Sequence, residues 1–188
     1  MRRNTHFFAA FFLCLLLSLA DAQESREKEK APQAAGKPEQ NIASFRNNFR
    51  AARKEALSAN KLLLVLFTIS DQPSGQSRKV IALYKYSKPF LRQAEPDYVL
   101  LHIDLPGDKY KLSYTHRRQN ETLRARFSVQ HFPSVAVIDP RSPWGGLLFR
   151  YTGAPLPTEL LKDLEKRIAP HLKRIRAARM KTEEGTEK

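Results

Sequence analysis

Cysteine is almost missing from this sequence: among 188 residues the only one is Cys14. It lies in an apolar stretch, residues 7–19, that follows two arginines and ends at Ala20-Asp21-Ala22, the pattern of a cleavable export signal. We therefore expect residues 1–22 to be a signal peptide and the mature chain to have no thiol; retention of this stretch as an uncleaved membrane anchor is the alternative, disfavoured because the apolar run is short. That excludes dithiol–disulfide exchange, a cysteine nucleophile, thiolate metal ligands and internal disulfide bonds.

Several catalytic motifs are missing as well. The chain has only 7 glycines and no phosphate-cradling glycine motif, and it contains no G-x-S-x-G sequence around a serine nucleophile. The histidines lack the pair spacing of a zinc site: His102, His116, His131 and His171. We expect His102, inside an apolar segment, to be a structural histidine. The sequence thus indicates no catalytic residue, no metal and no cofactor, and favours a binding protein over an enzyme.

Acidic residues are the minority, 19 against 33 lysines and arginines, which gives a net charge of +14. Such a charge favours an acidic partner or surface, such as anionic lipid head groups or cell-wall polymer. Nucleic acid is disfavoured because we expect export, to the periplasm or the extracellular space. The charge alternatively serves only to keep an exported protein soluble.

Large apolar residues are scarce in residues 23–40, which are rich in charge, proline and alanine. Such a segment buries too little surface to offset the entropy of ordering, so we expect a flexible linker there. The apolar pattern that begins at Asn41 predicts a folded domain over residues 41–170. A basic tail, residues 171–188, follows it.

Apolar periodicity predicts alternating helices and strands in this domain. An amphipathic helix starts near Asn41, with Ile42, Phe45, Phe49, Ala52 and Ala56 on one face, and Asn60 closes it. Strands are predicted at residues 61–67, 98–104, 135–139 and 147–152, the last two joined by a turn containing Pro140, Pro143, Gly145 and Gly146. Further helices are predicted up to about Ala94, kinked or ended by Pro89, over residues 121–127, and from Pro157 until Pro170 kinks or ends it.

The segment after the first strand carries a specific resemblance. Phe67-Thr68, Ser70-Asp71 and Arg78-Lys79 match secreted thioredoxin-like proteins, in which a strand ending in Phe-Thr leads through Ser-Asp-Trp to Cys-x-x-Cys-Lys-Lys. Both cysteines are absent here, and the five residues from Pro73 to Ser77 fill the segment with one residue extra. The resemblance therefore implies the family's fold without its redox activity.

Three further segments are similar to this family in the same order: Asp104-Leu105-Pro106, Gln119-Asn120 with Leu123, and Phe132-Pro133 before a strand, where the family has a cis proline. The resemblance runs from about residue 41 to residue 168. It implies an α/β thioredoxin-like fold, a central mixed β-sheet flanked by helices.

The resemblance also implies where a partner would bind. In this fold an extended polypeptide can lie beside the cis proline, so the partner we expect is an exported protein or an extended peptide. The corresponding residues are the cis-proline loop, Phe132, Pro133 and Ser134, and the altered active-site turn, Ser70, Asp71, Gln72, Pro73, Ser74, Gly75, Gln76 and Ser77. The helix start in this turn could accept an anion, or Ser74 or Ser77 could simply cap it.

Two alternatives stay open at this stage. The tail cations Lys173, Arg174, Arg176, Arg179 and Lys181 alternate with apolar residues, which suits either a basic amphipathic helix on an anionic surface or a frayed, solvated tail. The chain is otherwise an enzyme whose chemistry uses Ser74, Ser77 or a bound cofactor. Asn120-Glu121-Thr122 also fits the pattern of a glycosylation acceptor.

Overall fold

The computed structural model describes residues 44–142 and 145–186, with side chains up to residue 182. The expected signal peptide, the linker, Ile42 and Pro143 therefore lie outside the described residues. The elements follow one another as α3 (Phe49–Ser58), β1 (Leu62–Thr68), α4 (Gln76–Lys85), α5 (Lys88–Ala94), β2 (Tyr98–Asp104), the short 3-10 helix η1 (Lys109–Lys111), α6 (Tyr114–Arg126), β3 (Ser134–Asp139), β4 (Gly146–Thr152), α7 (Pro157–Arg167) and α8 (Ala169–Thr186).

The four strands form one mixed sheet in the order β2-β1-β3-β4. β1 pairs in parallel with β2 and antiparallel with β3, and β3 pairs antiparallel with β4. Every residue of β1 is buried, as its unbroken apolar run predicts for a central strand covered on both faces. All four predicted strands are confirmed to within one residue at each end.

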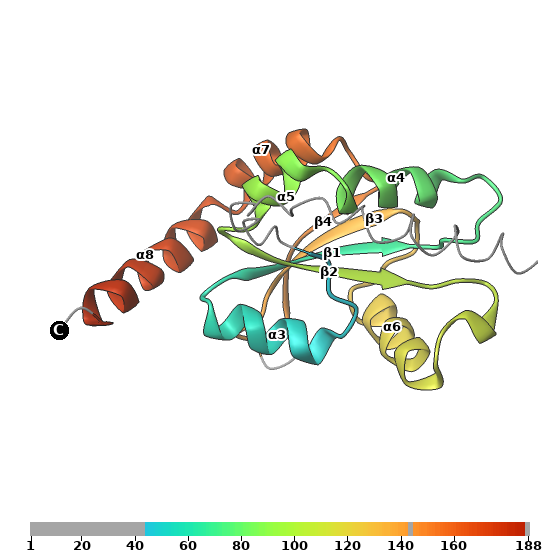
Figure 1. The fold of residues 1–188 in the computed structure, drawn as a ribbon, viewed down its shortest axis with the longest axis horizontal. Coiled ribbons are helices and arrows are strands. Elements are labelled where there is room, and N and C mark those ends of the chain that lie inside the picture. The colour runs from blue at the N-terminus through green and yellow to red at the C-terminus, as the bar shows by residue number, and fades with distance from the viewer. Residues whose placement is uncertain (1–43, 143–144, 187–188) are drawn as a thin grey trace, which may run out of the picture. The chain divides into compact units, whose positions relative to one another are not determined.

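Helices cover both faces of this sheet, as Figure 1 shows: α4, α5 and α7 lie on one face, and α3 and α6 lie on the other. Alternate residues of β1 point to opposite faces, and the core is divided accordingly. Leu62, Leu64 and Leu66 pack with Tyr84 of α4, whereas the side chains of Leu63, Val65 and Phe67 pack with Ala52 and Leu123 of α3 and α6. The predicted α/β architecture is confirmed.

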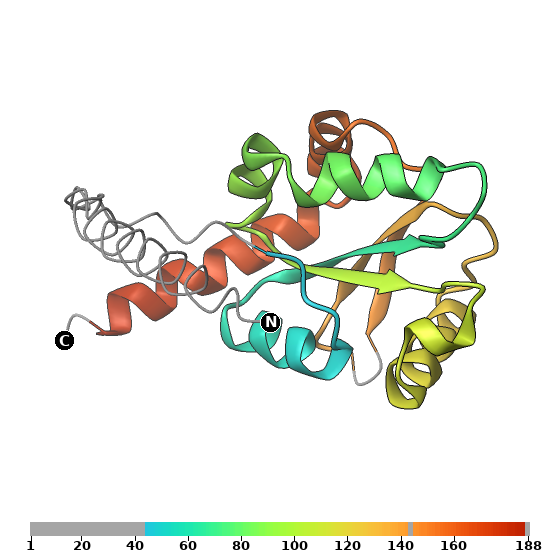
Figure 2. The ribbon, with the colours of Figure 1, turned by 45° about the vertical axis from the view of Figure 1, so that its right-hand side comes forward.

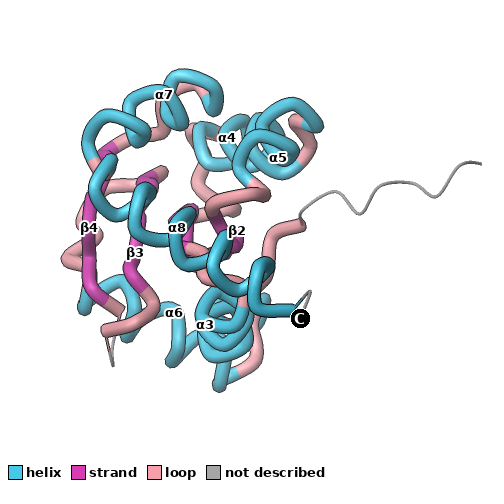
Figure 3. The backbone as a smooth tube through the Cα atoms, turned by 90° about the vertical axis from the view of Figure 1, so that its left-hand side faces the viewer, coloured by secondary structure: helices cyan, strands magenta, loops and turns pink. Residues whose placement is uncertain are grey.

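α8 lies across the end of the sheet at which β1 and β2 begin (Figures 2 and 3). Leu172 and Ile175 are 1% and 0% exposed and belong to the same core cluster as Leu160 and Leu164 of α7. The frayed, solvated tail is therefore the wrong alternative for this segment. Two buried apolar residues one turn apart make its first half part of the core.

Two helices begin later or earlier than the sequence indicates. α3 starts at Phe49 rather than near Asn41, because the Asn48 side chain caps it and Arg46 lies alongside β2, exchanging backbone hydrogen bonds with Leu100 and His102 at 2.8 Å each. α6 starts at Tyr114 rather than Glu121, because Ser113 caps it. Its first two turns contain few apolar residues, so periodicity gives no signal there.

The proline effects also differ in detail. The helix predicted to run to Ala94 is broken after Lys85, and Ser87 caps a new helix that has Pro89 in its first turn. The break between α7 and α8 falls at Ile168, just before Pro170. In each case the proline lies at the start of the following helix, the position where its missing N–H costs nothing.

Candidate functional site

The candidate site is formed where β1 ends and β3 begins. The antiparallel register pairs Phe67 with Ser134. The turn that follows β1 and the loop that precedes β3 therefore emerge at the same edge of the sheet (Figure 1). The Phe132–Pro133 peptide bond in this loop is cis. The structure thus brings together the two segments that the resemblance singles out.

The turn itself leads tightly from β1 into α4. Gly75, with φ at +67°, is the N-terminal boundary residue of α4, and its N–H donates to the Gln72 carbonyl at 3.1 Å. No side chain caps this helix start. Ser77 is fully buried and accepts a hydrogen bond from the Ile69 N–H at 3.1 Å, while exposed Ser74 is 3.5 Å from the Gln76 N–H. Ser77 therefore ties the helix to the strand and does not cap the helix, whereas Ser74 makes one long hydrogen bond, from the first N–H of α4.

Asp71 ties the turn to the loop after β2. Its carboxylate accepts hydrogen bonds from the backbone N–H groups of Gly107 at 2.9 Å and Asp108 at 3.1 Å, and its Oδ2 is 3.4 Å from the Lys111 Nζ. The two backbone hydrogen bonds, with the lysine beside them, lower the pKa of Asp71 to about 2. Asp71 is thus a positioning residue that holds the turn against the loop after β2.

Beneath the turn is a partly buried polar cluster centred on Asp104, the last residue of β2. Its carboxylate accepts hydrogen bonds from the hydroxyl of Thr68 at 2.7 Å and from the N–H of Ser70 at 2.9 Å. Because the Thr68 hydroxyl donates to Asp104, it accepts from the Nε2–H of His102, 2.8 Å away. The sequence did not single out Asp104 as the hub; its place at the end of a buried strand was the available signal.

His102 is consequently a neutral, structural histidine, as predicted. Its Nδ1 is 3.4 Å from the Nζ of Lys85, so each ring nitrogen has a partner. Burial, reinforced by the nearby Lys85 charge, lowers the pKa of His102 to about 4. No group of three or more metal-ligating side chains occurs within residues 44–142 and 145–186.

The cis-proline loop has backbone groups without a hydrogen-bond partner among the described residues. Pro133 and Ser134 are buried, and the Ser134 hydroxyl donates to the His131 carbonyl at 2.6 Å. The half-buried Phe132 side chain packs against the core cluster beneath α3 and α6. Its backbone N–H and C=O make no hydrogen bond with any residue in the described ranges.

Asn120 is not available as a glycosylation acceptor. It is only 4% exposed, and its Nδ2 donates to the backbone carbonyl of Asp104 at 2.7 Å. Attaching a sugar to this nitrogen would require the α6–β2 contact to open. The sequence pattern is correct for glycosylation, but the side chain faces inward.

The predicted basic patch in α8 is largely neutralised. Arg176 makes ion pairs with Asp97 at 2.6 Å and Glu165 at 2.7 Å, Arg179 pairs with Asp97 at 2.7 Å, and Arg174 pairs with Asp139. Lys173 and Lys181 are exposed. The five cations do not form one available patch. Over the described ranges, no helix combines the length and the apolar character needed to cross a membrane.

Solved structures with the same arrangement were found. A DsbH oxidoreductase matches 74% of this chain and 95% of its own length, with a TM-score of 0.58 and 18% sequence identity. A thioredoxin from Thermus thermophilus matches 66% of this chain and 86% of its own length, with a TM-score of 0.51 and 15% identity. The chain has a thioredoxin-like fold. No protein-family model and no curated protein sequence matches it.

The thioredoxin-like fold makes the serine positions informative. Ser74 and Ser77 have the spacing of the family's Cys-x-x-Cys pair and stand immediately before Arg78-Lys79. The extra residue noted in the sequence therefore falls before Ser74, at Gln72-Pro73. The turn leads from strand to helix with one exposed hydroxyl, Ser74, and one buried hydroxyl, Ser77.

Proposed function

We propose that this chain is an exported, redox-inactive thioredoxin-fold protein that binds an extended segment of another exported protein. The segment lies between the Ser70–Ser77 turn and the Phe132–Ser134 loop. The observation that carries the proposal is that the backbone N–H and C=O of Phe132 have no hydrogen-bond partner in the described ranges. The Ser70–Ser77 turn at the same end of the sheet contains no cysteine. A backbone unit of this kind at the edge of a buried site is an available partner for an added strand.

Redox inactivity rests on residue chemistry. Thiol–disulfide exchange needs a thiolate nucleophile, and a serine hydroxyl cannot take its place. The only cysteine, Cys14, is in the expected signal peptide. In an assay of insulin disulfide reduction beside a dithiol thioredoxin, we expect no activity above background; sustained turnover would contradict this part of the proposal.

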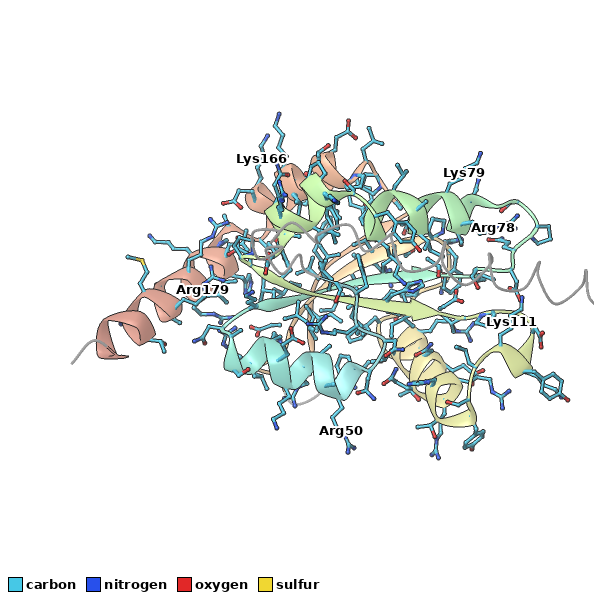
Figure 4. The ribbon with its side chains drawn as sticks, in the orientation of Figure 1. Arg50, Arg78, Lys79, Lys111, Lys166 and Arg179 are labelled. Atoms are coloured by element: carbon cyan, nitrogen blue, oxygen red, sulfur yellow. The ribbon has the colours of Figure 1, made fainter. Side chains whose placement is uncertain are left out.

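In the proposed binding mode, main-chain hydrogen bonds provide affinity, and the side chains around the Ser70–Ser77 turn provide selectivity. The Phe132 N–H and C=O pair with the backbone of the extended segment, and exposed Ser74 lies on the turn that faces it. Arg78 and Lys79 project from the first turns of α4, as Figure 4 shows, and both are exposed. Together with the positive end of the α4 dipole, they favour a segment with acidic side chains.

The two alternatives receive less support. Binding of an anionic surface through the α8 cations is weakened because three of the five are ion-paired. An enzyme using Ser74 or Ser77 needs a base, and within the described residues no histidine or carboxylate makes a hydrogen bond with either serine hydroxyl. His102 is engaged with Thr68 and Lys85. Neither alternative has an observation in its favour that peptide binding lacks.

The proposal is tested by selecting peptides from a random displayed library with the purified protein and then measuring amide hydrogen exchange. At a peptide concentration one hundred times Kd, exchange at the Phe132 N–H should slow by up to about 100-fold. Ser74→Trp should block binding, because it fills the exposed turn. The matched control Ser58→Trp, on exposed α3 surface, should leave binding intact. Binding that ignores Ser74→Trp and leaves Phe132 exchange unchanged would overturn the proposal.

A further inference from the structure

A groove on the face of the molecule formed by α3 and α6 is separate from the turn and the cis-proline loop. It has a volume of about 540 Å³, within the range of small-molecule sites. α6 supplies most of its lining, and the start of α3 supplies the rest; the residues are Phe49, Tyr114, Thr115, Arg118, Gln119, Thr122, Leu123 and Arg126. The groove extends over about 18 Å of α6, at 1.5 Å per residue.

Its position is fixed by a double contact between the two helices. The Gln119 Oε1 accepts a hydrogen bond from the Phe49 N–H at 2.9 Å, and its Nε2 donates to the Asn47 carbonyl at 3.0 Å. One amide side chain thus satisfies a backbone donor and a backbone acceptor at the start of α3. The groove is therefore held by hydrogen bonds rather than by loosely packed side chains.

The surface of the groove is apolar along its floor. Leu123 is 5% exposed and joins the core cluster, and Phe49 packs against the same cluster. Tyr114, at one end, is 66% exposed, a large ring left open to solvent. An apolar floor continued by an exposed aromatic ring favours an apolar ligand over water.

The cation that the described residues leave available beside this floor is Arg118, which lines the groove. Arg50 projects into solvent from the start of α3 next to Phe49 (Figure 4). The exposed guanidinium of Arg118 has no hydrogen bond or ion pair with a residue of the described ranges. No lining residue is acidic; Glu121, the one acid of α6, borders a different hollow of about 120 Å³.

We propose that this groove binds a free fatty acid, a single acyl chain with a carboxylate head. The acyl chain lies along half-buried Phe49 and exposed Tyr114, above Leu123 at the bottom of the groove. The carboxylate pairs with the Arg118 guanidinium, which can bind it with two hydrogen bonds. The positive rim matches an anionic head group, and the apolar floor matches the chain. The inference does not rest on the proposed peptide site, because no residue of the Ser70–Ser77 turn or the Phe132–Ser134 loop lines this groove.

A small ligand fits the groove better than a protein partner does. Stable protein interfaces bury about 800 Å² on each side and need a broad surface, whereas this hollow follows one face of one helix and the start of another. An acidic helical peptide is nevertheless the competing occupant, since apolar grooves also accept helices. The experiment therefore includes such a peptide.

The test is titration calorimetry of the purified protein with laurate, myristate and palmitate, each below its micelle concentration. We expect saturable binding of one fatty acid per chain. Affinity should rise about tenfold or more for each two added methylenes, because each buried methylene contributes about fourfold. A cationic amphiphile with the same chain as palmitate should bind at least fivefold more weakly, because the rim charge then repels the head group.

Two pairs of variants make the test specific to the groove. Thr122→Trp fills the groove and should weaken palmitate binding by about tenfold or more, while Ala125→Trp, exposed on α6 outside the lining, should not. Arg118→Ala should weaken it by up to about fivefold at low salt, while the exposed non-lining Arg124→Ala should not. The proposal is overturned if palmitate binds without saturation, if Thr122→Trp has no effect, or if only the acidic peptide binds.

Discussion

The two ends of the sheet carry the two polar segments that stand out in the sequence, and the structure treats them differently. At one end, three α8 arginines are paired with Asp97, Asp139 and Glu165. At the other end, Arg78 and Lys79 of α4 are exposed, and the backbone of Phe132 has no hydrogen-bond partner in the described ranges. The number of charges in a segment therefore does not tell which charges are available to a partner. Their pairing within the fold decides that.

The difference has a packing origin. α8 places Leu172 and Ile175 in the core, and this fixes its next turns against the start of β2, where Asp97 is only 10% exposed on its side chain. A carboxylate so poorly hydrated is stable as an ion only with cations beside it. Arg176 and Arg179 of α8 thus form ion pairs with the buried Asp97. Arg78 and Lys79 form no ion pair with a residue of the described ranges.

The largest effect is expected from removing the core contact of α8. Ile175→Ala should lower the free energy of unfolding by about 2–5 kcal/mol, because it deletes a fully buried branched side chain and leaves a cavity. Urea unfolding followed by circular dichroism measures the change.

Met180→Ala is the matched control on the same helix, because Met180 is 62% exposed. Its effect should stay within about 0.5 kcal/mol. Equal, small effects of the two variants would show that α8 is a detached tail, and the comparison between the two ends would then fail.

An intermediate effect is expected from acid, and only the turn end, through His102, should respond above pH about 4. The pKa of His102 is about 4 in the folded protein and about 6.5 when unfolded, so the folded state takes up the proton less readily. Stability should therefore be complete above pH about 6.5 and fall by about 3 kcal/mol as the pH decreases to about 4. His102→Gln, which keeps a donor for Thr68, should abolish this loss in urea titrations at pH about 7 and about 4.5.

The α8 end should respond only at lower pH. Burial disfavours the charged forms of Asp97 and Asp139, but hydrogen bonds from the arginines outweigh it and hold both pKa values below the ordinary range. Their contribution is present above pH about 4 and is lost as the pH falls through the folded pKa values. Asp97→Asn should reduce the loss below pH 4 and leave the His102 range unchanged. If His102→Gln and Asp97→Asn both changed stability in the same pH range, the assignment of the two pH ranges to His102 and to Asp97 would be contradicted.

Much of the fold could be predicted from the sequence, because the strands are marked by strong local signals. The run Leu62–Phe67 and the alternation of apolar segments with turns determine where strands lie and which strand is central. The helix starts at Phe49 and Tyr114 could not be placed by periodicity. They depend on the capping side chains Asn48 and Ser113, whose positions matter more than the sparse apolar residues around them.

The site was predictable as a location but not as a network. Matched residues located the turn and the loop, and the strand register brings them together. The inward turn of Asn120, the hydrogen bonds that occupy Asp71 and the ion pairs of Arg176 depend on residues distant in sequence, such as Asp104, Gly107 and Asp97. Long-range partners of this kind leave no periodic trace in a single sequence.

The smallest effects are expected from neutralising exposed cations, and they sharpen the comparison most directly. Lys173→Ala with Lys181→Ala, and Arg78→Ala with Lys79→Ala, should each change the free energy of unfolding by less than about 1 kcal/mol. Only the α4 pair should weaken binding of an acidic library-selected peptide, by up to about fivefold for each charge at low salt and by less at high salt. If the α8 pair weakened peptide binding equally, the effect would come from net charge alone. The exposure of Arg78 and Lys79 would then not be the feature that distinguishes the two ends of the sheet.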